Sequence, residues 1–222
     1  MNGAIGAILP LAIAVTISPL PIIAEVLLLF TRQHVRNAGA YLAGFLVGVA
    51  AVLSVLVLAV STLDPSASEQ SSGAAVVQLV LGILLLIAAR RQFRSRPRDG
   101  EVAPQPKWMQ GIESFTPRRS LAVGAAIGAA NPKNLAVGVA AAATITSAGL
   151  TTGATLITIA IYVIIAGSGV AAPFVVTVIY REKSHDILDG WKTWLSQNNA
   201  AVMTVLFLVF SVVLIGRGVA GI

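Results

Sequence analysis

The stretch "AANPKNLAVG", residues 129–138, places an amide, a proline, a lysine and a second amide in succession inside an otherwise apolar segment. A lysine ammonium near the centre of a bilayer costs roughly 2.5–3.5 kcal/mol on insertion scales. Proline removes an amide donor and clashes with the carbonyl four residues earlier. Irregular backbone at membrane depth survives only where it faces protein or a water-filled cavity. The stretch therefore predicts a broken helix with a polar, functional centre.

The composition supports a membrane setting. The 222-residue chain is 56% hydrophobic and only 11% charged, whereas a soluble domain is about 25% charged. It contains no cysteine, which excludes disulfides and thiolate metal sites. The net charge of +6 fits basic loops that orient a membrane protein, so we expect no nucleic-acid partner.

Six apolar segments are long enough to span a membrane, since about 17–25 residues are needed to cross it. They cover residues 3–30, 38–61, 73–89, 121–146, 150–180 and 200–215. The loops at 31–37, 90–120 and 181–199 are rich in Lys and Arg, whereas those at 62–72 and 147–149 contain none. The positive-inside rule then places the basic loops in the cytoplasm and both termini outside.

Each half of the chain has three spanning segments, so the second half must enter the membrane upside down relative to the first. This is the arrangement of inverted-repeat transporters. "ISPLPIIAEVLL" in the first segment aligns with "AANPKNLAVGVA" in the fourth. The predicted fold is an all-α polytopic membrane protein with six transmembrane helices as two inverted three-helix repeats (3+3), in which helices 1 and 4 are broken.

The segment between the halves is polar, basic and proline-rich, as expected of a linker. Within it, "KWMQGIESF" at 107–115 has the spacing of a short amphipathic helix at the lipid headgroups, and "HDILDGWKTWL" at 185–195 is similar. The predicted organisation is a first three-helix repeat at 1–89, a basic cytoplasmic linker with an amphipathic helix at 90–120, and a second repeat at 121–222.

The paired proline motifs define the candidate site. Breaks there free backbone carbonyls, and half-helix ends carry partial charges; in transporters such breaks bind the substrate. Prolines that only kink helices for packing are the alternative. The candidate substrate-binding residues are Ser18, Pro19, Pro21, Glu25, Asn131, Pro132, Lys133 and Asn134.

Lys133 and Glu25 are expected to approach each other across the repeat interface. Lys133 lies near the membrane midplane, and Glu25 is the only carboxylate clearly inside a spanning segment. Three roles stay open, namely a structural salt bridge, a pair in which Lys133 attracts an anionic substrate group, and proton coupling by Glu25. Glu25 is also close enough to Thr31 to extend toward the cytoplasmic face.

Small residues predict close helix contacts. Gly44 and Gly48 have GxxxG spacing, and Gly124, Gly128 and Gly138 lie among alanines. Such residues let helices approach or slide. Plain packing and a moving gate both fit this pattern.

Motifs for catalysis are missing from the sequence. The two histidines, His34 and His185, lie in loops far apart in sequence, and there is no HExxH, P-loop or nucleophile–base spacing. We therefore expect no enzyme activity, catalytic residue, metal site or cofactor.

The combination of "SPLP" at 18–21 and "NPKN" at 131–134 in a three-plus-three chain resembles the lysine-exporter (LysE) superfamily. Within it, "SPLPI", the long basic loop and "NPKN" most resemble the GAP family, the glycopeptidolipid- and sulfolipid-addressing proteins. Amino-acid exporters typically have Pro-Gly-Pro where this chain has Leu20, which argues against amino-acid export. The resemblance implies a role in moving envelope glycolipids and marks as functional Ser18, Pro19, Pro21, Asn131, Pro132 and Lys133.

The predicted function is a secondary transporter or flippase-like protein that moves an amphipathic, anionic envelope (glyco)lipid or precursor across a bacterial inner membrane. The expected partners are membrane lipids and the anionic lipid or glycolipid substrate, with a second copy of the chain and lipid-synthesis or export proteins as further candidates. One alternative is a non-transporting scaffold for lipid-synthesis or export machinery that acts through the basic loop. The other is a LysE-type exporter of a small polar solute.

Overall fold

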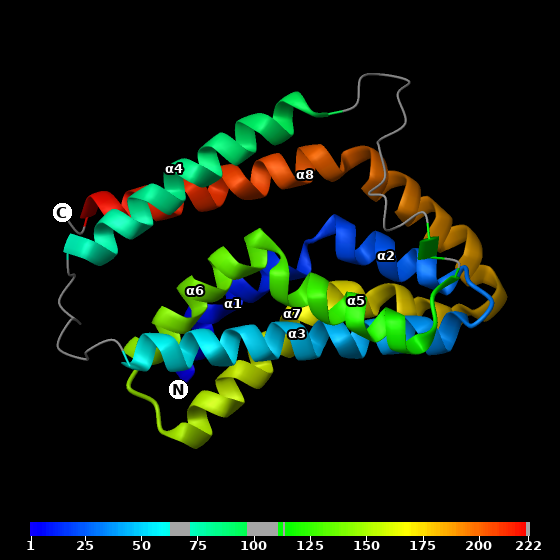
Figure 1. Ribbon diagram of the computed structural model, residues 1–222, viewed down its shortest axis with the longest axis horizontal. Helices are drawn as coiled ribbons and strands as arrows, with labels where there is room; N and C mark the ends of the chain where they lie inside the picture. Colours follow the sequence, from blue (N-terminus) through cyan, green and yellow to red (C-terminus); the bar gives the residue numbers. More distant parts are fainter. Residues whose placement is uncertain (63–71, 97–110, 113, 221–222) are drawn as a thin grey trace. The chain divides into compact units, whose positions relative to one another are not determined.

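The computed structural model describes residues 1–62, 72–96, 111–112 and 114–220, and the regular secondary structure there is helical. The prediction of an all-α protein is confirmed for these residues. Each of the six apolar segments is helical (Figure 1). The elements are α1 (Asn2–Thr16), α2 (Pro19–Leu29), α3 (His34–Thr62), α4 (Ser72–Arg94), α5 (Pro117–Ala130), α6 (Pro132–Ser147), α7 (Thr152–Tyr180), the 3-10 helix η3 (Arg181–Lys183) and α8 (Ser184–Ala220).

The first and fourth apolar segments are each divided into two helices, as predicted. α1 and α2 are bent by 55° at their break, and α5 and α6 are separated by the single residue Asn131. In both cases a proline, Pro19 or Pro132, is the first residue of the following helix. Its missing N–H has no acceptor to lose at that position, and its fixed φ suits the helix start.

Several helices are apolar enough to lie in a membrane. By length and composition, α3 and the run Thr152–Ala220 could each cross one, and α1 with α2 makes a third span if the bent pair counts as one. Large apolar side chains point outward, among them Val47, Leu58 and Ile164, each more than 60% exposed. Such surface is unusual in a soluble monomer. These helices indicate a membrane protein, and the six-span inverted arrangement stays a prediction.

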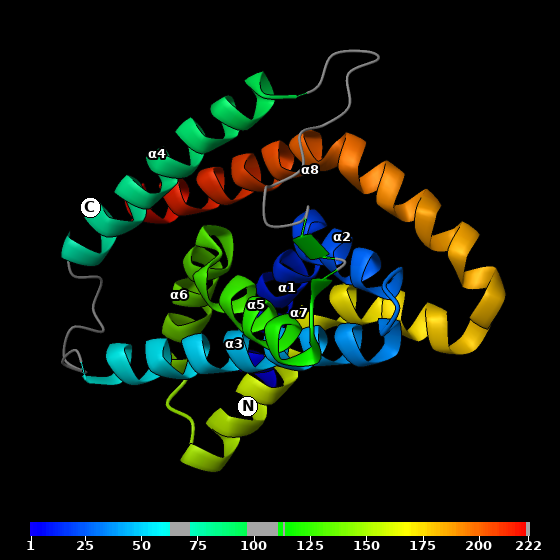
Figure 2. The same cartoon turned by 45° about the vertical axis from the view of Figure 1, so that its right-hand side comes forward.

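The chain divides into two compact units, which are residues 1–61 with 105–194 and residues 62–104 with 195–222. The first unit holds α1, α2, α3, α5, α6, α7 and the start of α8, and the second holds α4 and the rest of α8. The first unit therefore contains the first two apolar segments of each predicted repeat, and the second unit contains the third segment of each. In the second unit α4 lies beside the end of α8 (Figure 2), where a Cβ added at Gly82 would lie 2.7 Å from Ile215 Cγ1.

In the first unit, α3 and α5 pack backbone against backbone. A Cβ at Gly128 would lie 2.5 Å from the Phe45 carbonyl oxygen, which is closer than real Cβ contacts. Two glycines from each helix face a carbonyl of the other helix, namely Gly44, Gly48, Gly124 and Gly128. The predicted close packing is confirmed, and the GxxxG pair of α3 matches a second such pair in α5.

The predicted linker is partly helical, because α4 extends to Arg94 and α5 begins at Pro117. Most of the amphipathic helix predicted at 107–115 falls outside the described residues. The other predicted amphipathic stretch, 185–195, is no separate helix and forms the first part of α8. Leu188 is buried there, while Trp191 and Trp194 are exposed.

Candidate functional site at the two helix breaks

The break between α1 and α2 leaves backbone carbonyls without their helical donors. The Ala14 carbonyl would accept from the amide of Ser18, but that amide donates to the Thr16 carbonyl at 3.0 Å. The Ile17 carbonyl would accept from residue 21, and Pro21 has no N–H. In a membrane each such unpaired group costs several kcal/mol. The break therefore needs donors from elsewhere in the chain.

Lys133, on α6, supplies the missing donors. Its Nζ donates to the Ala14 carbonyl at 2.7 Å, to the Ile17 carbonyl at 3.0 Å and to the Ser18 hydroxyl. A lysine ammonium has three N–H groups, so the end of α1 uses all of them. The side chain is 2% exposed. Because carbonyls at a helix C-terminus carry partial negative charge, this helix end takes the place of a counterion.

The second break places Lys133 for this contact. Asn131 caps α6, since its Oδ1 accepts from the backbone amide of Lys133 at 3.0 Å and its carbonyl accepts from that of Leu135 at 3.0 Å. An asparagine at this position commonly contributes about 1 kcal/mol. Pro132 follows as the first helical residue. The motif "NPKN" thus starts a helix in such a way that its lysine reaches the first break.

The structural salt bridge between Lys133 and Glu25, one of the three roles left open by the sequence, is not present in the described residues. The ion pair found among the described residues joins Lys192 to Asp189, with 3.4 Å between Nζ and Oδ1. Glu25 is fully buried in α2, so it does not extend to the cytoplasmic face either, and neither carboxylate oxygen has a hydrogen-bond partner in the part of the chain described. The physical reason is that the free carbonyls of α1 already satisfy the Lys133 ammonium.

Glu25 lies near α3 instead. Tyr41, which is fully buried, donates its hydroxyl to the Pro21 carbonyl at 3.3 Å, one helical turn before Glu25. Lys133 and Glu25 therefore both lie at the α1–α2 pair. Lys133 reaches it through the carbonyls of the break, whereas Glu25 is a residue of α2 itself.

Asn134 is the other predicted site residue without partners. Its side chain is 6% exposed, and neither amide atom forms a hydrogen bond with the described residues. Buried polar groups are paired in the large majority of cases, so unpaired ones need an explanation. In this conformation Lys133 has no free N–H, whereas Glu25 and Asn134 are available to a new partner.

Sequence reasoning missed Thr16 as a residue that holds the end of α1, whereas Gly169 belongs to the small residues of the fifth segment for which close packing was expected. Thr16 donates its hydroxyl to the Ile165 carbonyl of α7 at 2.5 Å. A Cβ at Gly169 would collide with the Thr16 carbonyl, so α7 approaches α1 closely. A hydroxyl directly before "SPLP" is a weak signal, and nothing in the sequence pairs it with α7. The described residues include no group of side chains suited to a metal ion.

The fold and the site define a helical membrane protein in which two helix breaks meet through a buried lysine. The family model described as "Sap, sulfolipid-1-addressing protein" matches residues 8–220, so the chain belongs to this family. The matched range includes both breaks, and it confirms the resemblance to the sulfolipid-addressing proteins. Neither the curated proteins nor the solved structures give a match.

Proposed function

We propose that this protein is a secondary carrier of the flippase type, which moves an amphipathic, anionic envelope lipid or lipid precursor across the inner membrane. The observation that carries the proposal is the contact of Lys133 with the α1–α2 break. The description of the family as a sulfolipid-1-addressing protein supports a lipid as the cargo. The resemblance of "SPLP" and "NPKN" to the lysine-exporter superfamily supports a carrier mechanism.

The Lys133 contact can exchange its partners. Separating the two breaks would leave the carbonyls of Ala14 and Ile17 without donors and the ammonium without acceptors. Water could satisfy the carbonyls, and an anionic headgroup could satisfy the ammonium. Opening would then be costly without substrate and cheaper with it. This difference in free energy between two states is what a carrier needs in order to respond to its cargo.

The rest of the first unit offers a fixed frame for such a movement. α3 and α5 pack closely through reciprocal glycine contacts with carbonyls, where a larger side chain would clash. The half-helices α1, α2, α5 and α6 have free ends at the breaks. We therefore assign the movement to the breaks and the frame to the α3–α5 pair.

Glu25 and Asn134 are the candidate groups for the coupling ion and the headgroup. A charged carboxylate without a partner is costly at membrane depth, and Glu25 has none in the part of the chain described. Proton uptake and release at Glu25 would make that cost depend on the conformation. The Asn134 amide can both donate and accept, which suits the hydroxyl groups of a glycolipid.

The test is a reconstituted transport assay. The full-length protein, Lys133→Met and the exposed control Lys183→Gln are placed in liposomes with a fluorescent sulfated glycolipid, and a membrane-impermeant quencher reports its movement between leaflets. We expect transport by the wild type and by Lys183→Gln and a loss of about tenfold or more in Lys133→Met, since charge-assisted hydrogen bonds are worth about 1.5–3 kcal/mol each. Equal transport by all three proteins would contradict the proposal.

The alternatives give different results in cells. A scaffold would tolerate Lys133→Met and fail when residues 92–106 are deleted. A small-solute exporter would give resistance to that solute with no change in envelope lipids. A monodisperse elution profile for each variant separates loss of function from loss of fold.

A further inference from the structure

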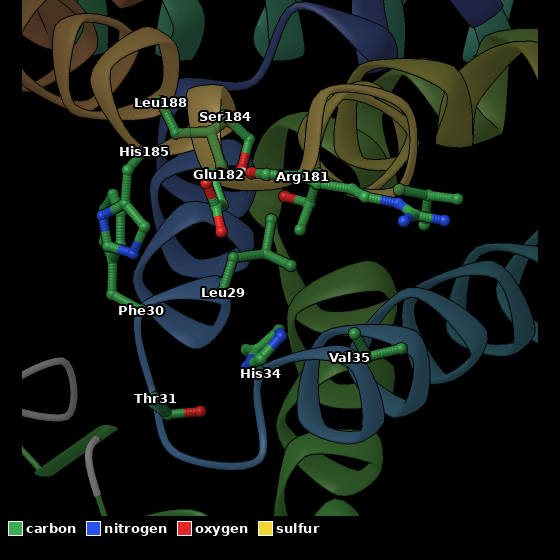
Figure 3. Close-up of a pocket in the computed structure, with 12 residues that line it drawn as sticks. Leu29, Phe30, Thr31, His34, Val35, Arg181, Glu182, Ser184, His185 and Leu188 are labelled. Carbon is green, nitrogen blue, oxygen red and sulfur yellow. Dashed lines mark hydrogen bonds between the residues drawn. The ribbon is translucent and has the colours of Figure 1, made fainter.

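A second polar site lies where α2 ends, α3 begins and α7 continues through η3 into α8. A cavity of about 460 Å³ opens there, and all of its lining residues belong to the first unit (Figure 3). It contains both histidines of the chain, His34 and His185, together with Arg181 and Glu182. Two residues that are far apart in the sequence are thus brought to one cavity. The basic loops that form it belong to the predicted cytoplasmic side.

The charged side chains of this cavity are free for a ligand. Among the described residues, neither Arg181 nor Glu182 forms an ion pair, and Figure 3 shows their side chains leaving η3 in different directions. His185 packs on Phe30, with ring centroids 4.6 Å apart. The polar floor is satisfied, because the Thr31 hydroxyl donates to the Leu28 carbonyl at 2.7 Å. The Arg181 and Glu182 side chains can therefore form further hydrogen bonds, whereas the Thr31 hydroxyl has already donated its hydrogen.

The backbone of Arg181, a residue that lines the cavity, is strained. Its φ is 47°, and no other non-glycine residue in the described part of the chain has a positive φ. Such a conformation costs about 1–3 kcal/mol and is concentrated at functional sites. The backbone is held on both sides, since the Arg181 amide donates to the Thr177 carbonyl and the Ser184 hydroxyl donates to the Arg181 carbonyl. The point at which the Arg181 side chain leaves the backbone is therefore held in place beside the cavity.

The surroundings of the cavity are apolar. Leu29 and Leu188 are buried in its wall, and Val178 is 55% exposed at its edge. The next residues of α7, Ile179 and Tyr180, are 65% and 53% exposed. A ligand in this cavity would meet the Arg181 guanidinium and the two imidazoles together with an outward apolar surface beside them. Lipids with anionic headgroups have this division.

We infer that the cavity binds the headgroup of an anionic membrane lipid that also carries hydroxyl groups. The planar guanidinium of Arg181 suits the oxygens of a phosphate or sulfate, and the imidazoles of His34 and His185 add donors. The Glu182 carboxylate would repel a bare anion, but it accepts hydrogen bonds from the hydroxyls of a glycerol or sugar. The apolar part of the lipid lies along Val178 and Ile179. This site does not depend on transport, because a lipid could bind here without being moved.

The experiment measures lipid binding to the full-length protein in a neutral detergent by native mass spectrometry. The probes are dioleoylphosphatidylglycerol and, as a neutral control, dioleoylphosphatidylcholine. The variants are Arg181→Gln and Lys183→Gln, which remove the same charge from the same 3-10 helix, although Lys183 does not line the cavity. We expect phosphatidylglycerol to bind about tenfold more tightly than phosphatidylcholine, and Arg181→Gln to lose most of that preference while Lys183→Gln keeps it.

Three results would overturn the inference. Equal losses in Arg181→Gln and Lys183→Gln would indicate general attraction to a basic surface. Equal affinity for the two lipids would exclude headgroup selection. If glycerol 3-phosphate displaced phosphatidylglycerol as effectively as the lipid itself does, the cavity would be a site for a free anion and not for a lipid. Should Arg181→Gln fail to fold, the exposed double variant His34→Gln with His185→Gln decides, because unchanged affinity there would also overturn it.

Discussion

Lys133 and Glu25 are both ionisable, both buried in the first unit and both close to the first helix break, yet only Lys133 has hydrogen-bond partners among the described residues. The Lys133 ammonium makes three hydrogen bonds at the α1–α2 break, two to carbonyls at the end of α1 and one to the Ser18 hydroxyl. The Glu25 carboxylate makes none with the described residues. The difference shows that a buried charge does not imply an ion pair, because a helix end can serve as the counterion. It also separates a group that holds this conformation together from one that does not.

The comparison gives the two residues different expected roles. Lys133 stabilises the conformation in which the breaks meet, and any opening must replace its three acceptors. Glu25 stabilises nothing that the described contacts reveal, so its presence in an apolar helix points to a function other than structure. Four substitutions test this difference, from the largest expected effect to the smallest.

Lys133→Met should have the largest effect on stability. Methionine retains much of the length and apolar volume of the side chain but leaves the carbonyls of Ala14 and Ile17 and the hydroxyl of Ser18 without a donor. Each orphaned buried acceptor costs about 1–3 kcal/mol, so we expect a loss of roughly 3 kcal/mol or more. Thermal unfolding in detergent checks this, with Lys183→Gln as the control. An unchanged midpoint would mean that the ammonium does not close the break.

Ser18→Ala should cost less, because it removes one of the three acceptors of the ammonium. One N–H of Lys133 then loses its partner, which corresponds to about 1–2 kcal/mol. Ser168→Ala is the matched control, because Ser168 is exposed on α7 and its hydroxyl donates to the Ile165 carbonyl of the same helix. A loss as large as that of Lys133→Met would show that the hydroxyl, and not the helix end, is the main partner.

Asn131→Ala should cost about 1 kcal/mol, the usual value of a helix cap. Thr151→Ala removes the corresponding cap of α7, where the hydroxyl accepts from the Ala154 amide at 3.4 Å. The two variants should lose similar stability, and only Asn131→Ala should impair transport, because only that cap positions Lys133. Equal transport by the two variants would mean that the Asn131 cap is not needed for the function of the second break.

The sequence predicted the breaks but not their partners. The effect of Pro19 and Pro132 on a helix is local, so it can be inferred from the sequence alone. The acceptors of Lys133 are backbone carbonyls, which every residue has, and no pattern marks the ones that a break sets free. Charges alone suggest Glu25 as a partner, and the salt bridge was one of the three roles left open; the described residues do not form it.

The same limit applies to helix packing and to the second cavity. The spacing of Gly44 and Gly48 predicted a close contact, but the identity of α5 as the opposing helix depends on the tertiary fold. His34 and His185 were dismissed because they are far apart in sequence, and the turn from α7 into α8 brings them together. Local backbone chemistry was predictable, whereas contacts between distant segments were not.

Glu25→Gln should have the smallest effect on stability. Unlike Lys133→Met, it could raise the stability of the protein. Glutamine keeps the shape of the side chain and removes an ionisable group that has no described partner, so we expect a change within about 0.5 kcal/mol or a gain. Thermal unfolding under the same conditions measures it, with exposed Glu182→Gln as the control. If Glu25 couples protons, this variant should fold normally in the transport assay and lose its response to a pH gradient. A loss of stability comparable to that of Lys133→Met would mean that Glu25 has a charged partner, and the contrast between the two residues would then fail.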